Sequence, residues 1–472
     1  MPEQQPLAEL PQAFEATRRM WGALGAGEGD APSQVLVGDH GAWLGGRLAV
    51  DDLALGAVTA GLLAAAELGA ARGGAGAPVE VSGEHVALSF HSERNALLAG
   101  RGAGAMFAPL SRLVRCAEGG WARTHGNYPH HAAALRRALS LDPALEGEGA
   151  VAALEHAAAG IGAEELEDTV MAEGGCAAAL RSAEEWAAHP AGAAVGAAQL
   201  IGTHPTAAAT APLLLGRPRN DARPAEGVRV LDLTRVIAGP VAGRTLAALG
   251  AEVLRVDPPH MPELPAQHLD ANPGKRTALL DLAEEAPREA LLAGADVILC
   301  GYRPGALARF GLEPEALAER HPHLVQVSLS AWGEAGPWHE RRGFDSLVQV
   351  ATGIAYECGE RAEAPGVLPA QALDHATGHL MAAAALVGLA RRARAERAPV
   401  TSLSLARTAA ELLALQRPAA ERDSHTGCAD PQRHRIGYGD VSLIAPPGSL
   451  AGEPLRWAHG PRPYGSDCAR WA

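Results

Sequence analysis

The sequence is poor in lysine and in aromatic side chains. Lys275 is the only lysine among 40 basic residues, and Phe, Trp and Tyr together make up 4% of the 472 residues. A chain of this length with 47% hydrophobic residues can bury a sizeable core. Alanine, leucine and valine must fill most of that core, and arginine must supply nearly all the positive charge.

Paired cysteines and targeting signals are also missing. The cysteines form no C-x-x-C motif, which excludes a disulfide framework and fits a reducing compartment. Met1 to Leu10 lack the pattern of a signal peptide, and apolar stretches such as Leu53 to Leu68 are too short for a membrane span. We therefore expect a cytoplasmic protein with no membrane partner. The six cysteines are Cys116, Cys176, Cys300, Cys358, Cys428 and Cys468.

Several classes of function lack support. The net charge of −14 argues against a nucleic-acid partner. No P-loop, G-x-S-x-G or H-E-x-x-H motif occurs, so Ser/His/Asp hydrolysis has no local support. His125, His130 and His131 cluster near Tyr128, but no carboxylate or cysteine stands at ligand spacing. We expect this cluster to be a surface loop and predict no metal site.

Composition and hydrophobic periodicity divide the chain into four regions. Residues 1–215 show mostly an Ala/Leu helical pattern, and the Pro- and Arg-rich residues 216–227 are typical of a linker. Residues 228–400 alternate short apolar runs with helical ones. Residues 401–472 are rich in Pro, Gly, Arg and Asp, and we expect an irregular tail.

The alternating region predicts an α/β fold. Its apolar runs predict strands at 228–231, 252–256, 296–299 and 324–329, with a helix over 242–249 after the first. Strands that alternate with helices form a parallel sheet covered on both faces.

A short sequence pattern, which we call the echo, occurs once in each half of the chain. Asp52 to Gly56 and Asp374 to Gly378 each open an apolar helix, and each helix leads to an Ala-Pro-Val triplet, at 77–79 and at 398–400. The Asp-to-Gly spacing is identical, and the Asp-to-Pro spacing differs by one residue. The echo is consistent with a duplication.

Six motifs follow one another between residues 228 and 400. They are Val230-Leu-Asp-Leu-Thr-Arg-Val-Ile-Ala-Gly-Pro240, Asn272-Pro-Gly-Lys-Arg276 with Leu280-Asp-Leu282, Tyr302-Arg-Pro-Gly305 with Arg309-Phe-Gly-Leu312, Ser328-Leu-Ser-Ala-Trp-Gly333, Arg341-Arg-Gly-Phe-Asp345, and Asp374 at the head of its helix. In this order they resemble the class III CoA-transferase family, which includes formyl-CoA and carnitine CoA-transferases.

The resemblance implies a fold, a substrate and a set of contacts. It implies a Rossmann-like parallel sheet with flanking helices and a smaller α/β domain. Coenzyme A would bind at the strand ends, where helix N-termini offer free N–H groups, as a thioester substrate and not as a permanently bound cofactor. Arginine and lysine suit its phosphates. By this resemblance the residues that contact CoA are Ile237, Ala238, Lys275, Tyr302, Arg303, Arg309 and Arg342, the last in the 341–345 turn beside the pantetheine arm.

The resemblance also assigns the chemistry to Asp374. Its carboxylate would attack the thioester carbonyl to give a mixed anhydride, and the CoA thiolate would then form an aspartyl-CoA thioester. An aspartate at the head of a helix is also an ordinary N-cap. Asp52 is a second candidate nucleophile, but no Rossmann half precedes it, and the N-cap interpretation is favoured there.

The order of segments departs from the family. Residues 45–205 resemble the family's C-terminal half, placed here before its N-terminal half. Gly301 replaces an asparagine of the family's CoA-binding segment. Phe344 stands where the family's acyl-CoA racemases use a histidine, although His375 and His379 beside Asp374 keep base chemistry open.

Three functions therefore remain. The first is a CoA-transferase that moves CoA from an acyl-CoA donor to a carboxylic acid acceptor. The second is an acyl-CoA racemase or isomerase, and the third is a CoA-binding protein without catalysis. Members of the family form interlocked dimers, so we expect a homodimer.

Overall fold

The computed structural model describes residues 14–25, 35–39, 41–74, 77–102, 104–204, 215–397, 400–425 and 429–472. The first ten residues, Ala398, Pro399 and Cys428, which entered the sequence analysis, lie outside the described residues.

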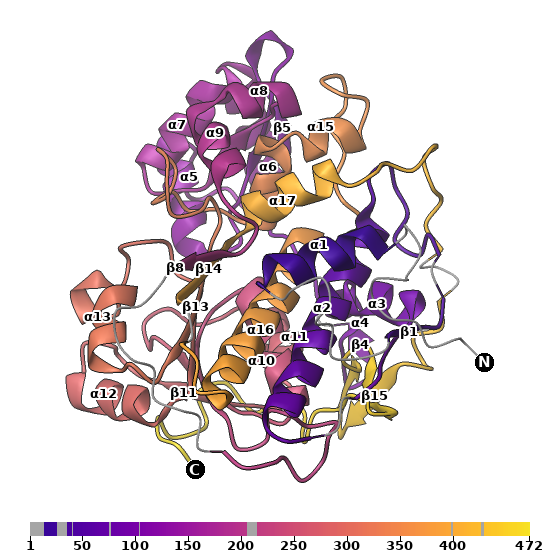
Figure 1. Cartoon of the computed structure of the whole chain (residues 1–472). Helices are drawn as coiled ribbons and strands as arrows, with labels where there is room; N and C mark the ends of the chain where they lie inside the picture. Colours follow the sequence, from indigo (N-terminus) through magenta and orange to yellow (C-terminus); the bar gives the residue numbers. More distant parts are fainter. Residues whose placement is uncertain are drawn as a thin grey trace.

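A seven-stranded sheet forms the centre of the molecule (Figure 1). Six strands are parallel, and the seventh, β8, adds an antiparallel edge. The parallel strands follow the order 3-2-1-4-5-6 of the Rossmann fold, so the expected α/β class is confirmed. In sheet order they are β11 (Lys275–Leu279), β10 (Glu252–Asp257), β9 (Arg229–Leu233), β12 (Val297–Cys300), β13 (Val325–Ser330), β14 (Val400–Ser404) and β8 (Gly202–His204).

Helices cover both faces of this sheet. Along β9, Val230 packs towards α10 and α16, whereas Leu231 and Leu233 pack towards α12 and α13. Such alternation is expected of a parallel strand buried on two sides. The helices of this half are α10 (Ala238–Ala248), α11 (Pro265–Ala271), α12 (Glu285–Gly294), η4 (Ala308–Phe310), α13 (Pro314–Arg320), α14 (Asp345–Ala351), α15 (Ile354–Cys358), α16 (Ala372–Ala393) and α17 (Leu405–Ala414).

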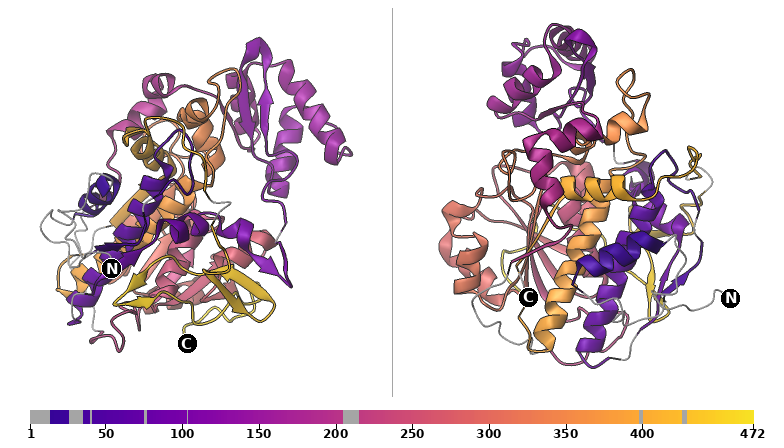
Figure 2. Two further views of the ribbon diagram at one scale, coloured as in Figure 1. Left: turned by 90° about the vertical axis from the view of Figure 1, so that its right-hand side faces the viewer. Right: turned by 45° about the horizontal axis from the view of Figure 1, so that its top comes forward.

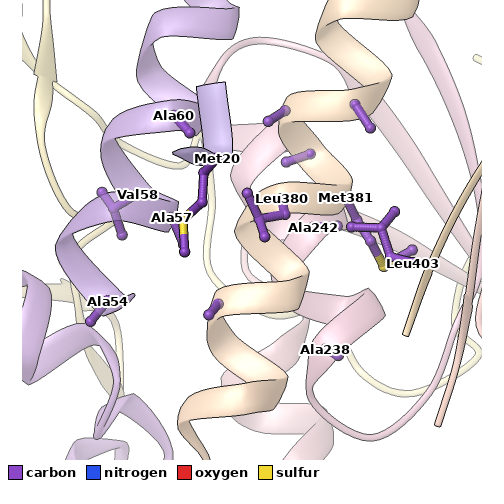
Figure 3. Close-up of a cluster of buried hydrophobic side chains, with 14 of the residues drawn as sticks. Met20, Ala54, Ala57, Val58, Ala60, Ala238, Ala242, Leu380, Met381 and Leu403 are labelled. Atoms are coloured by element: carbon purple, nitrogen blue, oxygen red, sulfur yellow. The ribbon is translucent and has the colours of Figure 1, made fainter. Parts of the chain in front are cut away.

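The helix α2 (Val50–Ala71) lies beside α16 and runs in the same direction. Gly61 of α2 faces the His379 carbonyl of α16, and further along Arg394 pairs with Glu67. Small and aliphatic side chains fill the space between α2, α16 and α10, as Figure 3 shows for Ala57, Leu380 and Ala242. By length and composition α2 could cross a membrane, but 89% of its most apolar window is buried in the core.

The echo between the two halves has a structural counterpart. Both α2 and α16 have 22 residues, and Asp52 and Asp374 are the third residue of their helices. Strand β1 (Val35–Val37) is parallel to β2 (Val79–Val81) across α2, just as β13 is parallel to β14 across α16. The upstream unit continues with α3 (Gly83–Ser89) and α4 (Ser92–Asn95), and α1 (Glu15–Ala23) packs on α2.

The smaller domain lies above the carboxyl edge of the large sheet (Figures 1 and 2). It contains the antiparallel sheet β5 (Leu113–Arg115), β6 (Trp121–Thr124) and β7 (Ala177–Ala179). Its helical elements are η3 (Ala117–Gly119), α5 (Pro129–Ala138), α6 (Gly147–Ala159), α7 (Ala163–Ala172), α8 (Ala183–Ala188) and α9 (Pro190–Ala197). This domain therefore comes from the upstream half of the chain, as the rearranged order predicts.

The prediction of an irregular tail from residue 401 onward is wrong in part. Strand β14 runs to Ser404, and α17 follows it directly. Four later strands pair with one another or with strands near the start of the chain, namely β3 (Leu97–Leu98) and β2. They are β15 (Arg435–Tyr438), β16 (Val441–Ile444), β17 (Ser449–Leu450) and β18 (Glu453–Pro454); β4 (Arg101–Gly102) pairs with β3.

Candidate active site

The turn that joins β9 to α10 lies where the strand order of the sheet reverses. Crevices at such points bind ligands in open α/β sheets. Val236 in this turn has φ 70°, a conformation that β-branched residues rarely adopt. Ile237 is the N-cap of α10 and Ala238 its first residue, so their backbone lies where the resemblance predicts a CoA contact.

Glycines bring α10 unusually close to its surroundings. A Cβ at Gly239 would lie 2.2 Å from Thr234 Cβ, and a Cβ at Gly243 would lie 2.5 Å from Asp232 Oδ2. Only glycine fits at these two positions, so the start of α10 lies tightly against the end of β9.

Asp374 lies beside this helix start. A Cβ at Gly378, one turn after Asp374 in α16, would be 2.3 Å from the Ala238 carbonyl oxygen. The second turn of α16 is therefore in close contact with the first residue of α10, on the carboxyl side of the sheet. The N-cap of α16 is Gln371, so the N-cap interpretation of Asp374 is wrong, and Asp374 belongs to the first helical turn.

The carboxyl group of Asp374 lies among other acids. Its side chain is buried, and its backbone N–H donates to Asp345 Oδ2 at 2.9 Å. Burial, then Asp345, then Glu93 raise the pKa of Asp374 well above the usual range. Burial also raises the pKa of Asp345, although Gln349 and the Asp374 backbone donate hydrogen bonds to it. A carboxylate held this way is poorly solvated and basic, which suits a nucleophile.

A histidine and a glutamate pair next to Asp374. His375 Nε2 lies 3.3 Å from Glu93 Oε2, and the His375 ring stacks on Phe90 at 5.0 Å. In the described part of the chain, His375 Nδ1 and Glu93 Oε1 are buried without a hydrogen-bond partner. Phe90 and Glu93 belong to the upstream half, which therefore supplies a wall of the site. The sequence points to His375, which stands beside Asp374, but not to Glu93, because nothing local links the two positions.

The loop after β12 lies next to the turn after β9. A Cβ at Gly301 would be 3.3 Å from Thr234 Cβ, which leaves little space for the asparagine of the family. Tyr302 and Arg303 line a cavity of about 530 Å³ between α13 and the strands β12 to β14. Arg303 Nη1 donates to the Glu340 carbonyl at 2.9 Å. Asp374 does not line this cavity, because α16 packs on the other face of the sheet.

Arg309 lies at a second, open depression of about 720 Å³. Its guanidinium stacks on Phe310 at 4.6 Å, and Arg288, Arg320 and His260 share the depression with the acids Asp281 and Glu285. Arginines at an accessible surface suit a phosphate group.

The prediction that Lys275 holds a CoA phosphate is wrong for its side chain. The lysine is fully buried, and its Nζ lies 2.8 Å from Asp232 Oδ2 and 2.9 Å from the Pro240 carbonyl oxygen. Burial lowers the pKa of Lys275 to about 8, and Asp232 works in the opposite sense. Lys275 therefore ties β11 to β9 and α10 inside the molecule, and its ammonium group does not reach a ligand on the surface.

The 341–345 turn is covered by the smaller domain. His125 stacks on Phe344 at 3.7 Å with 8° between the ring planes, and His131 meets the same ring edge-on at 5.6 Å. Both histidines are buried, so the predicted surface loop is wrong for them. Burial, then the neighbouring histidines and arginines, lower the pKa of His125 and of His131 to about 3. Arg342 is half-buried, and its carbonyl oxygen accepts a hydrogen bond from Trp332.

The upstream candidate Asp52 has a different setting. It lies in the first turn of α2, whose N-cap is Ala49, so Asp52 is not an N-cap either. Its neighbour Asp51 accepts hydrogen bonds from the backbone of Leu44 and Gly45. A Cβ at Gly56 would lie 2.9 Å from Ala16 Cβ, so the contact of Gly378 with α10 is repeated between α2 and α1. The large sheet does not take part in this repeat.

Comparison with known proteins supports the resemblance to class III CoA-transferases over part of the chain. The sequence model of CoA-transferase family III matches residues 225–443, a little under half of the chain. A probable fatty acyl-CoA transferase of Mycobacterium tuberculosis is 35% identical over 213 residues, which are 42% of this chain and 54% of that protein. Mouse succinyl-CoA:glutarate CoA-transferase is 34% identical over 203 residues, 39% of this chain and 46% of that enzyme.

The crystal structure of a hypothetical protein from Mycobacterium tuberculosis is 36% identical, covers 41% of this chain and 58% of that one, and has a TM-score of 0.38. The chain spans about half the length of the curated relatives it matches.

Proposed function

We propose that the protein transfers CoA from an acyl-CoA thioester to a carboxylic acid through Asp374. The observation that carries the proposal is the position of Asp374. Its carboxyl group is buried in the first turn of α16, whose Gly378 touches the start of α10 at the reversal point of the sheet. The match of residues 225–443 to CoA-transferase family III supports CoA as the transferred group.

The proposed reaction needs no proton donor and no metal. The Asp374 carboxylate attacks the thioester carbonyl, the C–S bond breaks, and a mixed anhydride and the CoA thiolate result. The thiolate attacks the Asp374 acyl carbon, which forms aspartyl-CoA and releases the donor's carboxylate. An acceptor carboxylate then reverses the two steps with its own acyl group. One negative charge moves between Asp374, the thiolate and the free acid.

The backbone supplies donors for the oxyanions. The N–H groups of Ala238 and Gly239 at the start of α10 have no partner within their helix, and the helix dipole favours negative charge there. The start of α10 touches Gly378, one turn after Asp374, whereas Asp345 accepts from the N–H of Asp374 at the start of α16. Donors fixed in advance at a buried site stabilise a tetrahedral oxyanion more than water does.

The open depression at Arg309 suits the phosphate-bearing end of CoA. From there the cofactor arm would pass Tyr302 and the Ile237–Ala238 backbone and bring its thioester to Asp374. This path follows the carboxyl edge of β12 and β9, which are neighbours in the sheet.

A racemase is the second candidate function, and one contact favours it. His125 and His131 meet Phe344 at the position where the family's racemases use a histidine, and their low pKa keeps both imidazoles neutral. A neutral imidazole can accept an α-proton, but a pKa of about 3 makes it a weak base, so the transferase stays the first candidate.

A transfer assay separates the candidates. The protein is incubated with an acyl-CoA panel in D₂O, with and without carboxylic acids, and the thioesters are followed by mass spectrometry. A transferase forms a new acyl-CoA only when an acceptor acid is present and leaves the α-hydrogens unexchanged. Deuterium uptake without an acceptor supports the racemase, and CoA binding without either change supports an inactive binder.

We further propose that the protein works as a homodimer in the cytoplasm, because members of the family that it resembles form interlocked dimers. Light scattering of the purified chain tests the assembly, and a monomer at micromolar concentration would contradict it.

A further inference from the structure

The backbone of the turn at Val236 is strained, so contacts from other residues must stabilise its conformation. A valine at φ 70° brings its branched Cβ against the backbone, and such a conformation persists only where the surroundings over-determine it. The turn leads directly into Ile237 and Ala238, the backbone proposed to meet CoA. Its shape therefore decides where the first N–H groups of α10 point.

One carboxylate holds the turn. The backbone N–H of Val236 donates to Glu263 Oε2 at 3.1 Å. Glu263 follows β10 in sequence, and its side chain is fully buried. Arg235, in the same turn, reaches back to the carbonyls of Met261 and Pro262, so the two loops are tied by side chains from both sides.

Glu263 is charged at neutral pH. Burial raises its pKa, but Arg255 and then Arg235 outweigh burial, and the net pKa lies below the usual range. Arg255 Nη2 lies 2.8 Å from Glu263 Oε2, and the same guanidinium holds Asp257 through Nε and Nη2. The residue facing the turn is therefore a fixed negative charge that accepts a backbone N–H.

The smaller domain reaches the same carboxylate. The Tyr128 hydroxyl donates to Glu263 Oε1 at 2.7 Å, and Arg235 lies over the Tyr128 ring at 5.6 Å. Tyr128 is the N-cap of α5, three residues after His125, which covers Phe344. One short segment of the smaller domain thus contacts both the 341–345 turn and the support of the Val236 turn.

We propose that Glu263 is a positioning residue that holds the Val236 turn in the shape that binds CoA, and that Tyr128 couples this support to the smaller domain. The inference rests on the proposed function in one respect, namely that CoA binds at the start of α10. It adds two residues that the family motifs do not contain, one from each domain.

A rescue experiment tests the proposal. CoA itself is titrated by calorimetry into the full-length protein and its variants. Glu263→Gln replaces the charged acceptor of the Val236 N–H by a neutral amide, and its NH2 group takes the place of an oxygen that accepts from other donors. CoA binding is expected to weaken roughly 5- to 100-fold, the range that corresponds to one strained residue. Val236→Gly relieves the strain, because glycine adopts positive φ freely. The double variant is therefore expected to bind CoA within about fivefold of Val236→Gly alone.

The rescue separates positioning from general stability. If Glu263 only stabilises the fold through Arg255, the double variant stays as weak as Glu263→Gln, and the proposal is overturned. The φ of Val236 in a crystal structure of Glu263→Gln gives a second readout that needs no ligand. A negative φ supports the proposal, and an unchanged φ near 70° overturns it.

Tyr128→Phe covers the case in which Glu263→Gln does not fold. It removes only the hydroxyl that bonds to the carboxylate, and we expect CoA binding to weaken about three- to tenfold. Tyr464→Phe is the matched control, because the Tyr464 hydroxyl accepts from the backbone N–H of Glu263 and leaves the carboxylate alone. Equal affinities for the two variants overturn the role of Tyr128. A wild-type protein that does not bind CoA would instead contradict the proposed function, while the φ measurement would still decide the role of Glu263.

Discussion

Replacing Gly378 by alanine tests the contact that places Asp374. The new Cβ would lie 2.3 Å from the Ala238 carbonyl oxygen and 2.7 Å from Val241 Cβ. Carbon atoms in contact normally stay about 3.5 Å or more apart, so α16 must shift by roughly 1 Å. Overpacking of this kind costs about 1–3 kcal/mol, and the better helix propensity of alanine returns about 1 kcal/mol.

We therefore expect Gly378→Ala to lower the free energy of unfolding by up to about 2 kcal/mol, measured by urea denaturation. The shift also moves Asp374 away from α10, and a displacement of about 1 Å can cost a hundredfold in rate. Formation of an acyl adduct at Asp374 should fall at least about tenfold.

Gly61→Ala is the matched control on the neighbouring helix. A Cβ at Gly61 would lie 3.6 Å from the His379 carbonyl oxygen, which is an ordinary contact. This variant should be as stable as the wild type or up to about 1 kcal/mol more stable. If Gly378→Ala matches Gly61→Ala in stability and reactivity, the packing account of the site is wrong.

Three further predictions concern charged groups. The folded pKa of Asp374 is raised, so its contribution to stability is present below the unfolded pKa and lost as the pH rises through the folded pKa. At pH 8, Asp374→Asn should therefore have a higher free energy of unfolding than the wild type, by about 1.4 kcal/mol for each tenfold difference in proton affinity between the folded and unfolded states. This advantage should be lost near pH 3, which urea denaturation at the two pH values measures. Lys275→Met leaves Asp232 buried without its partner and should destabilise the protein by about 3–5 kcal/mol, whereas a calorimetric dissociation constant for CoA should change less than about threefold. Arg309→Ala should weaken CoA binding about 5- to 20-fold at low salt and less at 1 M salt, because a surface arginine acts on phosphate through a screened charge.

The sequence predicts the strands that carry continuous apolar runs. The runs at 228–231, 252–256, 296–299 and 324–329 correspond to β9, β10, β12 and β13. Strand β11 was not predicted, because it begins with Lys275 and Arg276. The partner that neutralises Lys275 is Asp232, 43 positions away, so no local pattern shows that the lysine is buried.

Long-range contacts also explain the other errors. The weak periodicity of residues 401–472 predicts an irregular tail. Its strands β16 and β17 pair with β3 and β2, near the other end of the chain, so no local pattern shows them. No carboxylate or cysteine stands at metal-ligand spacing from His125 and His131, and the sequence therefore predicts that they lie in a surface loop. They are buried by Phe344, which follows them by more than 200 positions.

The candidate site was predicted in part. Ordered motifs located Asp374 and the Ile237–Ala238 turn, and the structure places both at neighbouring helix starts. Glu93, Glu263 and Tyr128 were missed. A β-branched residue in a turn before a glycine-rich helix start is unusual and could have drawn attention to Val236. The sequence alone, however, does not predict its positive φ.

The most direct test of the account is the mass of the protein after brief incubation with acyl-CoA thioesters, trapping with hydroxylamine and peptide mapping. The account predicts a hydroxamate on Asp374 that is absent in Asp374→Asn and that forms with no acceptor acid present. A hydroxamate on Asp52, or turnover without any adduct on Asp374, would contradict it.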